Sequence, residues 1–232
     1  MGIILVLGLG VRLYKINNPL ADWHSWRQAD TAAVTRNFLK YGVNPFLPHF
    51  DDMSDLGNGF NPNTYRLVEF PIFNLIHYGI IKVAPFGSLE FWGRIVSVVA
   101  SLVSAICVYV LVKKHVSIAA GLVSMAVFLF MPFNIYFSRV ILPDPLMVSL
   151  ALAALVALDW RPKWIAYVLA ALAVSVKPTA VFLLLPVLLS WRWAAITTVG
   201  PFLIWRMWQQ FHPEGIAPSF WLLNGDKIRF KG

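Results

Sequence analysis

Long uncharged apolar runs alternate with short charged clusters along the chain, and this pattern predicts membrane-spanning helices. Residues 95–112 form an uncharged run close to the length of about 20 residues that crosses a hydrocarbon layer about 30 Å thick. Residues 116–137 and the shorter stretch 145–158 predict two further spans. Residues 1–16 lack the basic start and the cleavage site of a signal peptide, so they predict a first membrane helix.

The C-terminal half continues with three apolar blocks, residues 164–176, 179–191 and 193–205, separated by Lys177-Pro178 and by Arg192. Each block is short for a membrane span. Flanking Trp residues and snorkelling Arg and Lys side chains can extend such helices. We therefore predict an all-α integral membrane protein with seven crossings.

The segment 17–94 predicts a long outer region with two helices at the membrane surface. Residues 28–41 place apolar side chains near one face, as in an interfacial helix. Residues 70–86 are apolar enough to span, but a crossing there would place Lys113-Lys114-His115 outside. We expect a transmembrane core over residues 1–210 and an outer tail over 211–232, which ends as a fragment of a longer protein would.

Composition and charge agree with a membrane protein. Hydrophobic residues make up 59% of the 232 residues and charged residues only 13%, against about 25% charged in soluble domains. The net charge is +8, but the basic residues form no stripe, which argues against nucleic-acid binding. Cys107 is the single cysteine of the sequence and lies in an apolar run, so a disulfide framework and a Cys-based metal site are excluded.

The basic residues of the short loops predict an orientation. Lys113-Lys114, Arg161/Lys163 and Arg192 fall at alternate turns, and such residues concentrate on the cytoplasmic side. The N-terminus is then cytoplasmic and the segment 17–94 lies outside. Arg12 and Lys15, at the outer end of the first helix, would have to snorkel outward or bind a lipid headgroup.

The first candidate cluster for chemistry is ADWHSWRQADTA, at residues 21–32. A carboxylate here fits a general base, and a guanidinium fits an anion-binding group. Alternatively, the acidic side chains only complement the positive end of a helix dipole. The candidates are Asp22, His24, Arg27, Gln28 and Asp30.

Two more clusters lie on the same predicted side. In SRVILPDPL (138–146), Asp144 and Arg139 predict a carboxylate–guanidinium pair, although Asp144 also fits a helix N-cap beside proline. In VSVKPTA (174–180), Lys177 predicts a contact to a lipid phosphate, unless it only snorkels to the headgroups.

The order of these motifs resembles the membrane-embedded GT-C glycosyltransferases that use polyprenyl-phosphate sugars. It is most similar to the group related to protein O-mannosyltransferases and aminoarabinose transferases of lipid A. The resemblance covers residues 2–210 and rests on RLYKI, DWHSWRQADTA, RNFLKYG, EFPIFN, GRIVS, SRVILPDPL and KPTA. It implies seven conserved helices with two juxtamembrane helices.

The resemblance also implies roles for site residues. Asp22 takes the place of the family's first acidic residue, the expected base, and Asp144 that of its second acid. The family usually shows Asp-Glu at the first site, whereas Trp23-His24 follows Asp22 here, which leaves Asp30 as a competing base. Glu69 stands where aminoarabinose transferases have a lysine on the lipid phosphate. The expected substrate- and phosphate-binding residues are His24, Arg27, Gln28, Arg66, Glu69, Arg139 and Lys177.

Together these features predict an inverting glycosyltransferase of the bacterial inner membrane, with its active site outside. A polyprenyl-phosphate sugar would be the donor, and a lipid, a protein or a glycan the acceptor. We expect no required cofactor; a divalent cation stays open, although no His forms an i, i+4 ligand pair. The rival hypotheses are a transporter of lipid-linked sugars and a non-catalytic membrane subunit.

Overall fold

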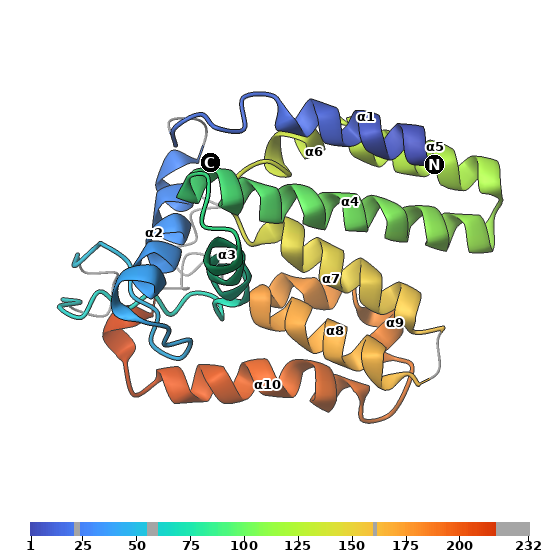
Figure 1. The fold of residues 1–232 in the computed structure, drawn as a ribbon. Coiled ribbons are helices and arrows are strands. Elements are labelled where there is room, and N and C mark those ends of the chain that lie inside the picture. Colours follow the sequence, from blue (N-terminus) through green and yellow to red (C-terminus); the bar gives the residue numbers. More distant parts are fainter. Residues whose placement is uncertain (21–23, 55–59, 160–161, 217–232) are drawn as a thin grey trace, which may run out of the picture.

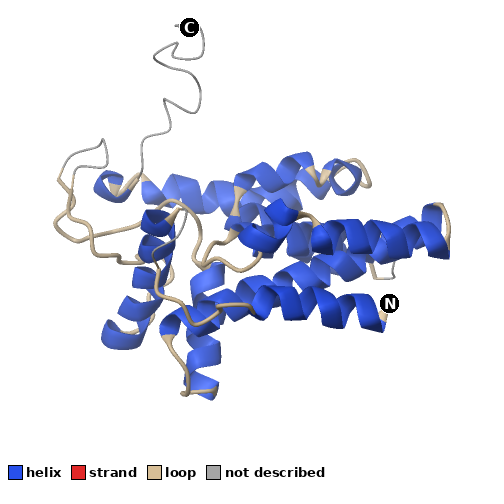
Figure 2. Ribbon diagram, turned by 90° about the horizontal axis from the view of Figure 1, so that it is seen from above, coloured by secondary structure: helices blue, strands red, loops and turns tan. Residues whose placement is uncertain are grey.

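The computed structural model describes residues 1–20, 24–54, 60–159 and 162–216. Within these ranges the chain is helical and contains no β-strand, only an isolated bridge between His49 and Tyr65. Figure 2 shows helices joined by loops throughout these ranges. The predicted all-α class is therefore confirmed. Most of the predicted tail 211–232 lies outside the described residues.

Five helices lie side by side with roughly parallel axes, and α2 (Ser25–Tyr41) runs across one end of this bundle (Figure 1). Neighbouring pairs in the bundle are α4 with α5, α4 with α7, α7 with α8, and α8 with α10. The five helices are α4 (Leu89–His115), α5 (Ile118–Phe130), α7 (Asp144–Ala157), α8 (Trp164–Val176) and α10 (Ala194–Gln209).

Small side chains allow the central helices to pack closely. Ala151 and Ala154 of α7 and Ala170 and Ala173 of α8 are fully buried in one apolar cluster. Small residues at a helix contact let two backbones approach, which is the common way for helices to associate inside a bilayer. The shared core of α7 and α8 therefore fixes how their ends meet.

The lengths of the helices test the predicted number of membrane crossings only in part. Of the helices in the described ranges, α4, with 27 residues, is the one long and apolar enough to cross a membrane by itself. The others, α1 (Gly2–Leu13), α3 (Ile72–Val83), α5, α7 and α8, are apolar but shorter. The seven-crossing count is not confirmed and stays a prediction.

Prolines interrupt two of the predicted elements. Residues 116–137 divide into α5 and α6 (Pro132–Phe137), and residues 179–191 into η1 (Pro178–Phe182) and α9 (Leu185–Leu188). Each new piece begins with proline in its first turn, where the missing N–H needs no partner. The expectation of one continuous helix in each stretch was wrong.

Both helices expected in the outer segment exist, as α2 and α3, but α2 does not bury a simple apolar face. Its buried side also holds polar side chains, among them Thr31 and Thr35. Asn74 of α3 donates to the carbonyl oxygen of Thr31 (2.6 Å) and to Oγ1 of Thr35 (3.0 Å). The two helices are thus joined by buried hydrogen bonds as well as by apolar contact.

Arg12 does not snorkel outward, contrary to expectation. Its side chain is fully buried, and its Nε donates to Oγ of Ser138 (2.6 Å), while Nη1 donates to the carbonyl oxygen of Gly8 (2.8 Å). A buried polar group needs such partners because burial removes its water. Arg12 therefore fastens the end of α1 to the loop after α6.

A glycine allows α3 and the start of α4 to meet. His77 of α3 is buried and donates from Nε2 to the carbonyl oxygen of Leu89 (2.9 Å). A Cβ on Gly93 would lie 2.9 Å from Cε1 of His77 and 3.1 Å from the Ile141 side chain. The contact leaves no room for a side chain at this position.

We expect Gly93→Ala to lower the free energy of unfolding by about 1–3 kcal/mol, because the added methyl group overpacks this contact. Gly79→Ala in α3 is the matched control, since no atom lies within 4 Å of a Cβ there, and alanine favours a helix interior over glycine. Thermal melting of both variants in detergent checks this. Equal melting temperatures would contradict the close contact.

Candidate functional site

The three sequence clusters meet at one end of the bundle, where α2, the start of α7 and the end of α8 converge (Figure 1). A cavity of about 640 Å³ opens there, and we call it the main cavity. Four of the predicted site residues line it: His24, Arg27, Asp144 and Lys177.

An ion pair between two of the sequence clusters lies in the main cavity. Lys177 Nζ donates to Oδ1 of Asp144 at 2.5 Å, and both side chains stay partly exposed. Asp144 begins α7 without capping it through its side chain, so the N-cap interpretation was wrong. Lys177 lies between α8 and η1 with an extended backbone, so it separates the two helices directly before Pro178.

Arg139 does not pair with Asp144, so that prediction was wrong. Its guanidinium carbon lies 5.9 Å from the ring centroid of Tyr14, and Arg139 does not line the main cavity. Only four residues separate Arg139 from Asp144, but the loop after α6 turns between them, with Leu142 N donating to Val140 O. The partner of Asp144 comes instead from α8.

The start of α2 contributes two more of the predicted site residues to the main cavity. His24 adopts a left-handed backbone conformation (φ 60°) directly before α2, and its ring lies 6.1 Å from that of Phe137. Arg27, in the first turn of α2, lines the main cavity and forms an ion pair with Glu69. Arg27 thus faces the main cavity, while its charge is compensated by Glu69, which does not line that cavity.

A second, more buried pair continues this network away from the main cavity. Arg66 Nη1 donates to Oδ2 of Asp30 at 3.0 Å. Burial raises the pKa of Asp30, although the positive charges of Arg66 and Arg27 act in the opposite direction. Burial also lowers the pKa of Arg66. Asp30 does not line the main cavity.

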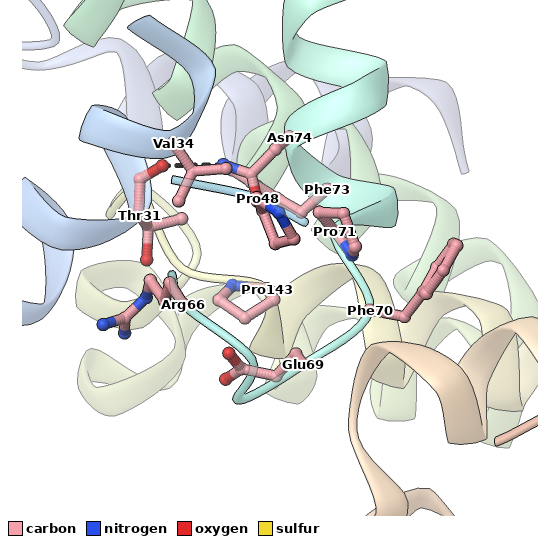
Figure 3. Close-up of a pocket in the computed structure, with 10 residues that line it drawn as sticks. All are labelled: Thr31, Val34, Pro48, Arg66, Glu69, Phe70, Pro71, Phe73, Asn74 and Pro143. Carbon is pink, nitrogen blue, oxygen red and sulfur yellow. Dashed lines mark hydrogen bonds between the residues drawn. The ribbon is translucent and has the colours of Figure 1, made fainter. Parts of the chain in front are cut away.

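A small pocket beside the main cavity shows where the two pairs approach each other. Arg66 and Glu69 both line it, and they lie around Pro143, the residue before Asp144 (Figure 3). The pocket holds only about 20 Å³, which suits about one water molecule. Glu69 therefore faces this pocket and Arg27, while the main cavity is lined by other residues.

Gln28 is fully buried and acts on the backbone of the loop before α7. Its Oε1 accepts from Ile141 N at 3.1 Å. From the other side, Oγ of Ser97 donates to the carbonyl oxygen of Val140 at 2.6 Å. These contacts hold the loop segment that leads to Asp144. Gln28 does not line the main cavity. Asp22 lies outside the described residues, so its role stays a prediction.

Most of the wall of the main cavity is apolar, and sequence patterns did not single these residues out. An apolar side chain in a membrane protein can face lipid, core or cavity, and one hydropathy pattern fits all three. The described residues hold no group of three or more His, Cys, Asp or Glu side chains that could share one metal ion. The apolar wall includes Phe128, Met131, Phe133, Phe137, Leu142, Met147 and Val148.

A comparison with protein families shows to which family the chain belongs. The model of the family described as dolichyl-phosphate-mannose-protein mannosyltransferase matches residues 71–212, more than half of the chain. The chain belongs to this family. The chain matches no curated protein and no solved structure.

Membership in the mannosyltransferase family confirms the resemblance to GT-C enzymes and a membrane-bound glycosyltransferase in general terms. The matched range contains Asp144 and Lys177, and it ends beyond α10. His24 and Arg27 precede it. The main cavity is therefore built from the matched part of the chain together with the start of α2, which precedes the matched range.

We expect Asp30→Asn to lower the free energy of unfolding by about 1–3 kcal/mol, because it leaves the buried Arg66 guanidinium without its charged partner. Asp159→Asn is the control, since the Lys114–Asp159 pair is about half exposed and such pairs contribute about 0–1 kcal/mol. Chemical unfolding in detergent compares the two. A smaller loss for Asp30→Asn than for Asp159→Asn would contradict this account of the pair.

Proposed function

We propose that this protein transfers a sugar from a polyprenyl-phosphate donor to an acceptor at the outer face of the membrane, with inversion at the anomeric carbon. The observation that carries the proposal is one cavity of about 640 Å³ that combines an apolar wall with two cations and a carboxylate. An apolar wall suits a prenyl chain. Arg27 and Lys177 suit its phosphate.

The two cations serve the leaving group. A donor phosphate would accept charge-assisted hydrogen bonds from Lys177 and Arg27. When the bond between the anomeric carbon and the phosphate oxygen breaks, its electron pair stays with the phosphate, whose negative charge increases. Fixed cations stabilise that developing charge more than the charge of the bound donor, so they lower the barrier.

The Asp144–Lys177 pair supplies a base in the same step. A donor phosphate takes over the ammonium of Lys177, which releases the Asp144 carboxylate to accept the proton of the acceptor hydroxyl. The hydroxyl oxygen then attacks the anomeric carbon from the face opposite the phosphate. Asp30 suits this role less well, because it is bound to Arg66 outside the main cavity. Asp22 is the competing base.

The orientation belongs to the proposal. Lys114 pairs with Asp159 at the end of the bundle opposite the main cavity. Lys113, in the last turn of α4, and Lys163, directly before α8, also lie at that end. A cytoplasmic location for this end satisfies the preference of short basic loops. The cavity then opens at the outer face of a bacterial inner membrane, where lipid, protein and glycan acceptors are all available. Since Arg27 and Lys177 meet the phosphate charge, we propose that no divalent cation is required.

Purified protein with a radiolabelled polyprenyl-phosphate sugar and a membrane extract as acceptor source tests the transfer. We expect consumption of the donor in the presence of EDTA. Asp144→Asn should lower the rate about 10²- to 10⁴-fold, the usual contribution of a general base. Lys177→Gln should lower it about 10²-fold, a typical loss for one electrostatic group.

Arg36→Gln is the control, because Arg36 belongs to an exposed pair with Asp51, away from the main cavity. It should keep the wild-type rate. Wild-type rates for both Asp144→Asn and Lys177→Gln would refute the site. Movement of intact donor across a vesicle membrane without its consumption would instead establish a transporter.

A further inference from the structure

A basic cluster lies outside the main cavity, where α1 ends and where the chain leaves α6. Lys15 Nζ lies 5.4 Å from the ring centroid of Tyr14, and the guanidinium carbon of Arg139 lies 5.9 Å from the same centroid. Tyr14 itself is 65% exposed. Two cations therefore lie against one exposed aromatic ring, and we call these three residues the Tyr14 cluster.

Neither cation of the Tyr14 cluster is neutralised by a carboxylate in the part of the chain that the structure describes. The salt bridges there involve other basic residues: Arg27, Arg36, Arg66, Lys114, Lys177 and His212. Like charges that the fold brings together repel each other. An anion bound at the Tyr14 ring would be attracted by both cations.

Arg12 adds a third positive charge beneath the same surface. It is fully buried, and its Nη2 has no hydrogen-bond partner, while its other nitrogens donate to Ser138 and Gly8. Ser138 directly precedes Arg139, and Arg12 lies three residues before Lys15. The bond from Arg12 to Ser138 therefore holds the two halves of the Tyr14 cluster together and strengthens its positive potential.

The neighbouring surface of α1 indicates what kind of anion fits. One side of α1 exposes only apolar side chains, and Tyr14 and Lys15 directly follow the end of the helix. An apolar helix face followed by an aromatic and a basic residue is typical of the membrane interface, where lipid headgroups lie. The exposed apolar residues are Ile3, Val6, Leu7, Val11 and Leu13.

We propose that the Tyr14 cluster binds the headgroup phosphate of an anionic phospholipid, whose acyl chains lie along the exposed face of α1. Arg139 and Lys15 hold the phosphate, and Tyr14 lies beneath it. Neither Lys15 nor Arg139 lines the main cavity. The lipid is thus a second ligand, and its binding does not depend on the proposed transfer reaction.

Native mass spectrometry of the purified full chain tests this proposal. The protein is presented with equal amounts of phosphatidylglycerol and phosphatidylcholine that carry the same acyl chains. We expect retention of phosphatidylglycerol to exceed that of phosphatidylcholine by about 10- to 30-fold, since each basic residue near an anionic headgroup contributes about fivefold. The double variant Lys15→Gln/Arg139→Gln should lose this preference.

Charge-matched variants separate the site from net charge. Lys40→Gln/Lys82→Gln removes two cations from other aromatic rings, those of Tyr41 (4.9 Å) and Tyr78 (5.7 Å), and should keep the preference. Lys15→Arg/Arg139→Lys should keep it as well. Lys15→Gln alone, at an exposed position, should lower it about fivefold, which keeps the test valid if the double variant folds poorly.

Three results would overturn the proposal. The first is an unchanged preference in Lys15→Gln and in Lys15→Gln/Arg139→Gln. The second is an equal loss in Lys40→Gln/Lys82→Gln, which would reveal an effect of net charge alone. The third is displacement of phosphatidylglycerol by a tenfold excess of inorganic phosphate, which would assign the site to a free anion.

Discussion

Compensation of buried charge is the constraint on which this end of the molecule depends. Three ion pairs join four separate parts of the chain: Arg66 with Asp30, Arg27 with Glu69, and Lys177 with Asp144. Desolvation makes any one of these charges costly without its partner. Two of the pairs hold the loop at residues 60–71 against α2, the third holds the end of α8 to the start of α7, and the bond from Ile141 N to Gln28 joins these two units. The main cavity is the space that this arrangement leaves.

The three pairs differ in how far a ligand can reach them. The Arg66–Asp30 pair is more buried than the Lys177–Asp144 pair and lies outside the main cavity, where it holds α2 to the loop at residues 60–71. The Lys177–Asp144 pair is more exposed and faces the cavity, so a ligand can take the place of either partner. Arg27 lines the main cavity, whereas its partner Glu69 lies outside that cavity. Arg27 can therefore meet a ligand while it stays paired. Exposure thus distinguishes the two pairs that hold α2 from the pair that a ligand can reach.

Sequence patterns predicted the helices well and the pairings poorly. Apolar periodicity located α8 within its observed bounds and found both α2 and α3, because hydropathy and helix period are local properties. The break at Lys177-Pro178 was predicted, whereas the breaks at Pro132 and Pro186 were visible in the sequence but were not predicted. The choice of Lys177 over Arg139 as the partner of Asp144 depends on how α7 and α8 pack, and the burial of Arg12 depends on where Ser138 lies. Neither fact is local.

The alanine-lined contact between α7 and α8 has a consequence for how such an enzyme can vary over time. Asp144 begins one of these helices and Lys177 follows the other, so the distance between the two charges depends on the relative register of the helices. A larger side chain at Ala151 or Ala170 would shift that register from deep inside the bundle. Selection on the reaction would then act on residues that never contact a substrate. The side-chain volume tolerated at these alanines would be constrained together with the site itself.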